Sequence, residues 1–556
     1  MDETVKRRAV ATAEPEVARA LAQARGMRRI EAWAPLMVGL AALALNLTRL
    51  GAPSLWMDEA FSVQLARQPL STVLAAYSSG AEPNMIAYHL ALHGWLALGA
   101  ALGLPATEFF VRLPSAVFAA AAASALYALG RRFLGRTAAV AAAVVYAASG
   151  WQLTYAQEAR GYALQLALVV VGWLALLAAV SARSSGWRAW RWWALFVAAM
   201  TLAVYTQAFS ALVLLAQGLA LGAWLVWPSA WRALARRALP GALASFVAIG
   251  LLITPFVLTG RSGSKTGWLP SPSVAELAGK LEGLLGSGHR LALALGAAVA
   301  LGLAAGAALW LLATPAGVRL RTRLPLVWGR MDGGALIGEA RPAAGGLALW
   351  VVVPAALSYV ISLGPDRIFS SRYLVVILPG LCLLLGAGVA ALRWPVGRLV
   401  AVGALAVVMV ALAPSYYAHA QVEDWRTPVR WLERAYHPGD GLVAYNNVQG
   451  CELPVDYYLE TDGSAARFDA DSPGVVQWSL YGHGNPFKLF GKALERSALA
   501  AYAAEHPRLF FIEGRFADAR DAAKAHATQA WLDAHYRLIG QTSNGVVTIR
   551  LYDTRE

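Results

Sequence analysis

The sequence predicts a polytopic α-helical membrane protein with a small soluble α/β domain at its C-terminal end. Of its 556 residues, 58% are hydrophobic and only 14% are charged, which is too apolar for a protein that folds in water. Apolar runs of about 18 or more residues recur between Ala32 and Ala413, as membrane-spanning helices require. From about Ser415 onward, the composition becomes that of a soluble domain.

Residues 1–32 are predicted to form a cytoplasmic tail. This segment is polar and carries no recognisable cleavable signal sequence. Basic side chains next to the first span are retained in the cytoplasm, so this span is expected to be an uncleaved anchor. The residues that support this orientation are Lys6, Arg7, Arg8, Arg28 and Arg29.

The net charge of +14 indicates membrane topology rather than nucleic-acid binding. The part from Ser415 onward holds 14 Lys and Arg against 18 Asp and Glu, so the preceding part holds 33 against 15. An excess of basic residues between membrane helices is typical of cytoplasmic loops. Cys382 lies in an apolar run and Cys451 in the C-terminal region, so no disulfide is predicted.

The loop after the first span is predicted to lie along the outer face of the membrane. Residues 60–77 have the pattern of short amphipathic helices with a break at Pro69. The apolar stretch 83–102 contains His89 and His93, which are unusual in a spanning helix. If this stretch lies flat, every later basic cluster falls on the cytoplasmic side, as the positive-inside rule requires; if it spans, every one falls outside. Those clusters are Arg131, Arg132 and Arg136; Arg183, Arg188 and Arg191; Arg232, Arg236 and Arg237; Arg319, Arg321, Arg323 and Arg330; and Arg393 and Arg398.

Eleven spans are therefore predicted within a membrane domain of residues 33–414. An odd number places the C-terminal domain, 415–556, outside the cytoplasm on the same side as Asp58. No span carries an Asp, Glu, Lys or Arg near its middle. The spans are about 33–47, 112–130, 137–153, 162–181, 192–206, 208–227, 239–259, 290–313, 345–363, 373–392 and 399–414.

The C-terminal domain shows short strands that alternate with helices, which predicts a small α/β fold. About 140 residues are enough to bury a core of their own. The predicted strands are 441–445, 509–512, 536–539 and 546–551, and the predicted helices are 497–506 and 517–535.

Candidate functional residues gather at the outer ends of the predicted spans. Asp58 and Glu59 stand side by side just past the first span, in the stretch from Ser54 to Ser62. Carboxylates and arginines together suit a lipid phosphate ligand, because arginine can clamp phosphate oxygens and a carboxylate can take a proton. Taken singly, each could instead solvate a helix end or anchor it at the interface. The other outer-face candidates are Glu82, Tyr155, Gln157, Glu158, Arg160, Tyr205, Gln207, Lys265, Arg367, Arg372 and Tyr373.

Four motifs in order make the chain resemble a known group of enzymes. They are Leu55-Trp56-Met57-Asp58-Glu59-Ala60-Phe61-Ser62, Arg112-Leu113-Pro114-Ser115, Tyr155-Ala156-Gln157-Glu158-Ala159-Arg160-Gly161-Tyr162 and Arg372-Tyr373-Leu374. The order is similar to that of the bacterial relatives of the dolichyl-phosphate-mannose protein mannosyltransferases, glycosyltransferase family 39. These are GT-C glycosyltransferases, with the lipid A aminoarabinose transferases as cousins. The resemblance covers about residues 30–415.

The resemblance implies transfer of a sugar from a polyprenyl-phosphate donor to an acceptor outside the cytoplasm. It implies a multi-pass protein of the bacterial inner membrane, with membrane-parallel helices in the first outer loop. Carried over by motif, Asp58 is expected to be the catalytic base, with Glu59 beside it and Glu158 as a second acidic residue. Arg160 and Arg372 would hold the donor phosphate.

Two departures from the family pattern bear on metal binding. Family members often have His-Pro-Pro where this chain has Glu82-Pro83-Asn84, and Tyr-Thr-His where it has Tyr205-Thr206-Gln207. The loss of both histidines leaves the metal unassigned. The Glu82 carboxylate could still bind a divalent cation such as magnesium or manganese.

The expected reaction is a single displacement that inverts the anomeric carbon, with Asp58 as base. If the acceptor is itself a phosphate or carboxylate, no base is needed and Asp58 would orient the sugar instead. The acceptor is a lipid, a glycan or a protein, and nucleic acid is not expected as a partner. A lipid-linked sugar transporter or flippase is the alternative, although coupled transporters usually place ionisable residues at the bilayer midplane and this chain has none there. A membrane scaffold would leave the clustered charges unexplained.

Overall fold

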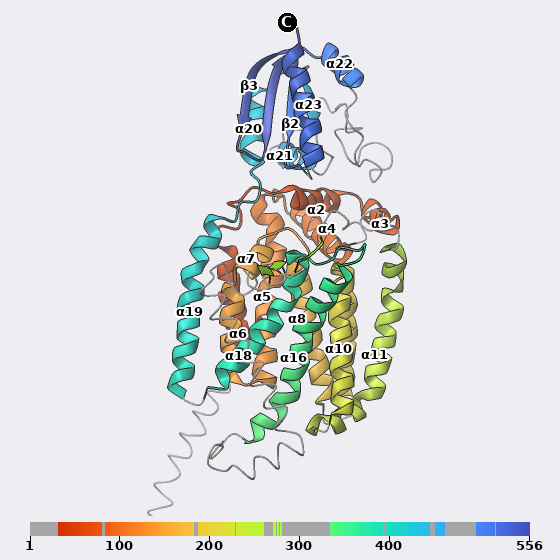
Figure 1. The fold of residues 1–556 in the computed structure, drawn as a ribbon, viewed down its shortest axis with the longest axis vertical. Helices are drawn as coiled ribbons and strands as arrows, with labels where there is room; N and C mark the ends of the chain where they lie inside the picture. Colours follow the sequence, from red (N-terminus) through yellow and green to blue (C-terminus); the bar gives the residue numbers. More distant parts are fainter. Residues whose placement is uncertain are drawn as a thin grey trace, which may run out of the picture.

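The computed structural model describes residues 32–80, 84–182, 187–227, 229–260, 271–273, 275–276, 279–280, 334–392, 395–444, 451–461, 496–516 and 519–555. The chain forms a bundle of roughly parallel helices, with an α/β domain at one end of it (Figure 1). This is the polytopic helical architecture that the sequence predicts.

The bundle contains helices at every predicted span that falls within the described residues. Among the described residues, six helices are long and apolar enough to cross a membrane by length and composition. The other bundle helices do not meet both conditions; most are shorter, and Trp187–Thr206 has 20 residues. The predicted span 290–313 lies outside the described residues, so the total of eleven stays a prediction. The bundle helices are Ala32–Leu47, α5 (Glu108–Phe133), α6 (Arg136–Ala148), α7 (Gly150–Ala156), α8 (Tyr162–Val180), α9 (Trp187–Thr206), α10 (Ser210–Val226), α11 (Ala230–Gly260), α16 (Gly334–Ile361), α18 (Leu378–Ala390) and α19 (Pro395–Ala418).

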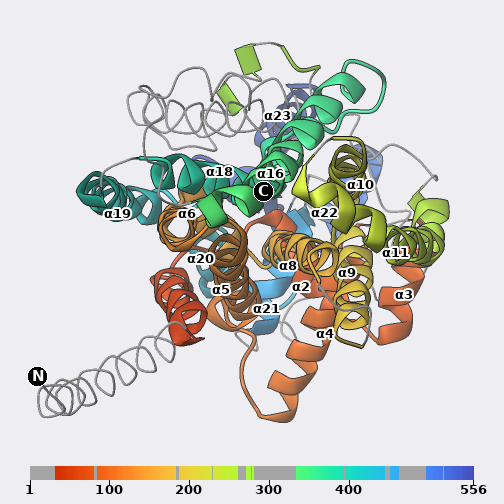
Figure 2. The same ribbon diagram turned by 90° about the horizontal axis from the view of Figure 1, so that it is seen from below.

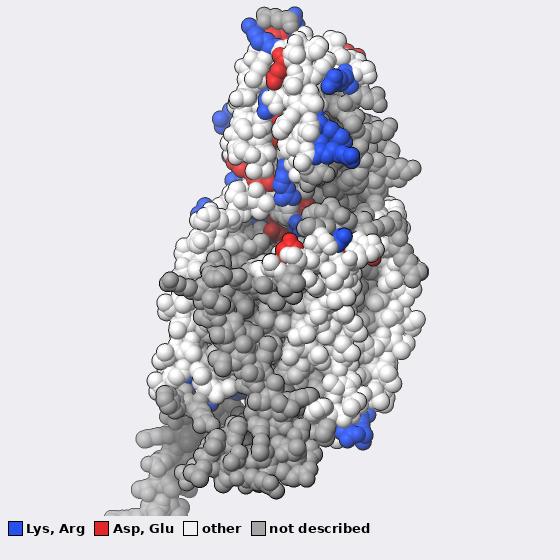
Figure 3. All heavy atoms as spheres, viewed as in Figure 1, with Lys and Arg blue, Asp and Glu red and all other residues white. Residues whose placement is uncertain are grey.

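The outward faces of the peripheral helices are apolar. Leu251 on α11 is 71% exposed and Leu399 on α19 is 74% exposed. A continuous apolar surface of this kind is unfavourable in water and is expected where a helix faces lipid. Basic residues are clustered instead at the end of the bundle away from the α/β domain (Figure 3).

Three helices of the first outer loop cap the opposite end of the bundle. They are α2 (Met57–Arg67), α3 (Leu70–Ser78) and α4 (Ile86–Ala101). In the view along the bundle, α4 is seen from its side whereas α5, α8 and α9 are seen end on (Figure 2). Helix α4, which makes up most of the apolar stretch 83–102, therefore runs across the bundle direction, in agreement with the flat orientation that the charge pattern predicts.

His89 is a core residue of this capping layer. Its side chain is buried against the rings of Phe61 and Tyr88. Burial lowers the pKa of His89 to about 3, because the charged imidazole would lose its hydration. The side chain is therefore neutral at physiological pH and packs as an aromatic ring.

The C-terminal domain contains a four-stranded mixed sheet in the order β1-β2-β4-β3. Strands β1 (Gly441–Ala444) and β2 (Arg508–Glu513) are parallel, and β4 (Thr548–Asp553) is antiparallel to both β2 and β3 (Arg537–Ser543). All four predicted strands are present. The helices are α20 (Arg426–Ala435), α21 (Leu453–Thr461), α22 (Arg496–Glu505) and α23 (Ala519–His535).

Helices α20 and α21 were not predicted from the sequence, and α21 packs directly on α2. Leu453 of α21 lies in one apolar cluster with Ala60 and Phe61 of α2. The phenol oxygen of Tyr458 accepts a hydrogen bond from the backbone N–H of Leu55, at 2.8 Å. The C-terminal region therefore contacts the stretch that carries the two adjacent carboxylates.

Candidate active site

Asp58 lies in the first turn of α2, where two arginines from other elements converge on it. Its Oδ2 atom is 3.2 Å from Nη1 of Arg372 and 3.7 Å from Nη2 of Arg160. Arg160 also donates to the backbone carbonyl of Asp58, at 3.2 Å. Arg160 precedes α8, and Arg372 lies in the short helix α17 (Ser371–Leu374). Three segments that are distant in sequence therefore meet at one carboxylate, which remains 18% exposed.

Glu59, the neighbouring carboxylate, is fully buried and paired with Arg112. Arg112 donates from Nε to Oε1 at 2.8 Å and from Nη2 to Oε2 at 2.6 Å. The backbone N–H of Ala159 donates to Oε1 as well, at 2.7 Å. Both oxygens of Glu59 thus accept hydrogen bonds from the protein itself. The pair joins α2 to α5 and to the loop that carries Glu158 and Arg160.

Arg112 extends this arrangement to the end of the first span. Its Nη1 donates to the carbonyls of Leu50 and Pro53, and its Nη2 donates to that of Ser54. Guanidinium has five donors in a fixed planar fork, so a single arginine can fix a whole turn of backbone. These hydrogen bonds hold the backbone of residues 50–54, which leads into α2.

Glu158 lies in the loop between α7 and α8. Burial, together with the negative charge of Glu59, raises the pKa of its carboxyl to about 8, although the positive charges of Arg160 and Arg372 oppose the shift. Glu158 is therefore mostly protonated at pH 7, where it can donate a hydrogen bond to an oxygen of a ligand.

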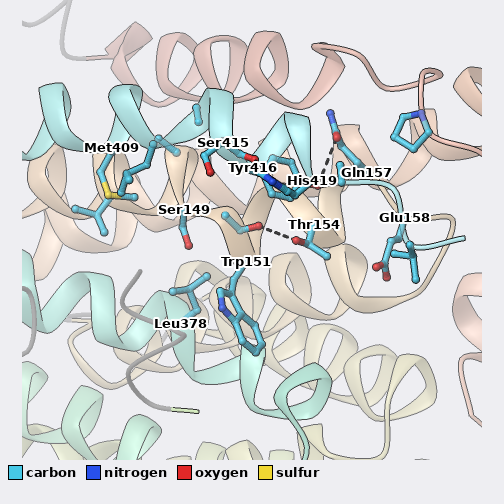
Figure 4. Close-up of a pocket in the computed structure, with 18 of the residues that line it drawn as sticks. Ser149, Trp151, Thr154, Gln157, Glu158, Leu378, Met409, Ser415, Tyr416 and His419 are labelled. Atoms are coloured by element: carbon cyan, nitrogen blue, oxygen red, sulfur yellow. Dashed lines mark hydrogen bonds between the residues drawn. The ribbon is translucent and has the colours of Figure 1, made fainter. Parts of the chain in front are cut away.

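A cavity of about 470 Å³ opens beside this loop, between α6, α7, α18 and α19. Glu158, Gln157 and Thr154 lie at one end of it, and Met409 lies at the other (Figure 4). The wall away from Glu158 is largely apolar. Its side chains include those of Val145, Leu378, Leu381, Cys382, Leu385 and Met409.

Several predicted site residues support the structure around Asp58. Gln157 donates to the backbone carbonyls of Asn46 and Thr48, at 2.8 Å each. The ring of Tyr155 packs on that of Tyr162, with 4.6 Å between centroids. The ring of Tyr373, next to Arg372, stacks on Phe209 at 6.0 Å.

Other predicted residues make contacts away from Asp58. Tyr205 donates to the carbonyl of Leu252 and packs against Tyr77 and Phe256. Gln207 is buried. Arg367 donates to the hydroxyl of Ser271 and the carbonyl of Ser362, so it joins its own loop to the segment at Ser271. Glu82 and Lys265 lie outside the described residues.

No metal centre is found in the part of the chain that the structure describes. Groups of three or more His, Cys, Asp or Glu side chains placed to hold a metal ion do not occur among these residues. Glu82, the residue for which the sequence suggests a cation, is not one of them.

Sequence reasoning assigned no role to four residues that contact the first turn of α2 or the residue before it: Arg112, Trp56, Glu423 and Arg515. Arg112 begins the motif Arg112-Leu113-Pro114-Ser115, but nothing in the sequence indicates that it pairs with Glu59. Trp56 precedes the acidic pair, and both Arg372 and Arg515 lie over its ring at 5.9 Å from the centroid. Glu423 accepts from the backbone N–H of Met57 at 3.2 Å. Such pairings depend on chain folding over hundreds of residues, so spacing cannot reveal them.

Comparison with known proteins gives two related findings. Residues 89–258 match the family model described as dolichyl-phosphate-mannose-protein mannosyltransferase. The structure of ArnT from Cupriavidus metallidurans in the apo state superposes with a TM-score of 0.55 at 14% identity, covering 94% of this chain and 98% of that one. ArnT bound to undecaprenyl phosphate gives 0.52 at 14% identity, with the same coverage. Among curated proteins, no significant match is found.

The structural likeness extends over almost the whole chain, including the C-terminal domain, whereas the family match covers part of the bundle and α4. The chain therefore has the GT-C glycosyltransferase fold and resembles the protein mannosyltransferase-like and aminoarabinose transferases of that fold.

Proposed function

We propose that this protein is a membrane glycosyltransferase that moves a sugar from a polyprenyl-phosphate donor to an acceptor outside the cytoplasm. The observation that carries the proposal is the convergence of Arg160 and Arg372 on Asp58 at the outer end of a GT-C bundle. The partly exposed carboxylate provides a proton acceptor, and the two guanidinium groups beside it provide a clamp for phosphate.

The reaction is a single displacement at the anomeric carbon. The acceptor hydroxyl attacks this carbon while Asp58 takes its proton, and the bond from the carbon to the phosphate oxygen breaks. The polyprenyl phosphate leaves with its electron pair, and the arginines stabilise the negative charge that develops on it. Attack from the face opposite the phosphate inverts the configuration.

Glu59 and Glu158 have different roles from Asp58 in this mechanism. Glu59 already accepts three close hydrogen bonds from Arg112 and Ala159, so it positions α2 and the Glu158 loop. Glu158 is protonated at neutral pH and donates to a phosphate or sugar oxygen.

The cavity beside Glu158 supports a lipid-linked donor. It is polar at the end near Glu158 and largely apolar along α18 and α19, as a phosphate attached to a hydrocarbon chain requires. The structural match that contains undecaprenyl phosphate has a ligand of this class.

A transporter of lipid-linked sugars is the other candidate, and one assay separates the two. Purified protein in detergent is given radiolabelled polyprenyl-phosphate sugars and a crude cell-envelope extract. We expect wild type to transfer the label and folded Asp58→Asn to lose at least about a hundredfold, the usual contribution of a general base. Equal transfer by both proteins would remove Asp58 as the base. If the donor is not consumed but moves across proteoliposome membranes, the protein is a transporter.

A further inference from the structure

The C-terminal domain places an arginine at the candidate active site. Arg515 lies two residues beyond the end of β2, yet its guanidinium carbon is 5.9 Å from the ring centroid of Trp56. Arg372, which contacts Asp58, lies over the same ring at the same distance. One arginine from the bundle and one from the C-terminal domain therefore meet at the residue that precedes α2.

Glu423 forms an ion pair with Arg515. Its Oε1 atom is 3.5 Å from Nε of Arg515. Its Oε2 atom accepts from the backbone N–H of Met57 at 3.2 Å and from the indole N–H of Trp425 at 2.9 Å. The Glu423 side chain is only 1% exposed, so its charge needs a cationic partner. The carboxylate thus connects Arg515 to the first turn of α2, next to Asp58.

Arg515 nevertheless keeps a surface for a ligand. Its side chain is 47% exposed, compared with 28% for Arg372 and 13% for Arg160. Trp56 beneath it lines the cavity, is itself 7% exposed, and has an indole N–H for which the described residues offer no acceptor. On the face shown in Figure 3, charged side chains gather at this junction, whereas the described side chains along the middle of the bundle are uncharged.

We propose that Arg515 is a specificity-determining residue that binds a phosphate or carboxylate group of the acceptor. The inference rests on the proposed transferase function and adds that the acceptor is an anionic molecule. Arg160 and Arg372 belong to the bundle and contact Asp58, where the donor phosphate is proposed to bind, whereas Arg515 reaches the site from the C-terminal domain. A guanidinium fork can bind either anion through two parallel hydrogen bonds.

The test uses the full-length protein and a cell-envelope extract separated by anion exchange into anionic and neutral fractions. We expect wild type to label the anionic fraction. Arg515→Gln is expected to need about tenfold more of this fraction for half-maximal rate, the loss that one charge-assisted contact of about 1.4 kcal/mol implies. Arg515→Lys keeps the charge and should lie between the two. The matched control is Arg537→Gln. Arg537 is an exposed residue of the edge strand β3 and pairs with Asp553 of β4, so this variant should match wild type.

Two further measurements identify the group that Arg515 binds. Inorganic phosphate should compete with the anionic fraction in wild type and more weakly in Arg515→Gln, while undecaprenyl phosphate should bind both proteins equally. Labelling of the neutral fraction, or an unchanged requirement in Arg515→Gln, would overturn the proposal. So would loss of undecaprenyl phosphate binding, which would assign Arg515 to the donor. If wild type consumes no donor at all, the transferase function itself fails, which is a distinct result. If Arg515→Gln does not fold, the comparison of Arg515→Lys with wild type decides.

Discussion

The two acidic residues nearest the candidate reaction centre differ in their surroundings. Asp58 lies partly exposed between two arginines, whereas desolvation raises the pKa of Glu158 to about 8. A carboxyl group that stays protonated at neutral pH can donate a hydrogen bond while a neighbouring carboxylate acts as a base. The division of roles follows from hydration and neighbouring charge, not from residue type.

The raised pKa of Glu158 has a measurable effect on stability. Its folded-state value of about 8 exceeds the ordinary value of 4.5, so the folded state binds more protons between these pH values and stability falls as pH rises through this window. Glu158→Gln removes this dependence. We expect its melting temperature in detergent to equal that of wild type near pH 5 and to exceed it at pH 9. Glu505→Gln, at an exposed position, serves as the control. If the melting temperatures of wild type and Glu158→Gln change with pH in the same way, the assignment is refuted.

Arginine geometry predicts a difference between Arg372 and Arg367. Lysine keeps the charge but loses the planar fork, so Arg372→Lys should raise the donor KM by about tenfold through a weaker phosphate contact. Arg367→Lys should leave the donor KM unchanged, because Arg367 holds Ser271 and Ser362 rather than Asp58. Initial rates at varied donor concentration measure both. Equal effects would mean that the two arginines contribute to one site.

At the scale of elements, the position of α2 depends on contacts from both sides. Arg112 of α5 fixes its first turn through Glu59, and Tyr458 of α21 fixes the residues before it through Ser54 and Leu55. Apolar packing of α2 on α4 and α21 gives the helix its orientation, and these polar contacts set its register. Asp58 is therefore placed by the surroundings of the helix rather than by its own contacts alone.

The buried pair predicts opposite outcomes for the adjacent carboxylates. Glu59→Gln leaves the Arg112 charge buried without its partner, at a cost of about 3–5 kcal/mol. We expect this variant to lose most of its monodisperse yield in detergent, whereas Asp58→Asn keeps it. Arg112→Met combined with Glu59→Gln should recover part of the yield, because the unpaired charge is gone. A well-folded, active Glu59→Gln would contradict the positioning role.

At the scale of the whole molecule, charge and hydrophobicity separate the chain into layers. Apolar side chains cover the described part of the bundle, charged groups gather at its junction with the C-terminal domain, and basic side chains lie at its other end (Figure 3). A bilayer around the bundle would place Asp58 at the membrane surface. A lipid-linked donor within the membrane and an acceptor from the aqueous side can then meet at this residue.

This layering predicts the orientation of the protein. Alkaline phosphatase fused after residue 556 should be active, because the enzyme needs the extracytoplasmic compartment, and a green fluorescent protein fused there should be dark. Fusions that end after Arg136, within a predicted cytoplasmic cluster, should show the reverse. An active phosphatase at Arg136 would contradict the positive-inside assignment and the flat orientation of 83–102.

The sequence by itself determined the class of the protein, most of its elements and the identity of the principal candidate residues. Hydrophobic runs, basic loops and alternating strands are local patterns, and hydration acts on them locally, so helices and strands appear where they were predicted. Asp58, Glu158, Arg160 and Arg372 were found because polar residues at membrane helix ends are conspicuous.

Only the tertiary structure decided what each candidate contacts. It separated Glu59 from Asp58 by burying it against Arg112, placed Arg367 and Tyr205 in contacts away from Asp58, and brought Glu423 and Arg515 to a helix more than 350 residues earlier in the chain. Pairings of this kind arise from the packing of distant elements. Dehydration and charge then give chemically identical side chains different roles, because both depend on neighbours that sequence spacing does not encode.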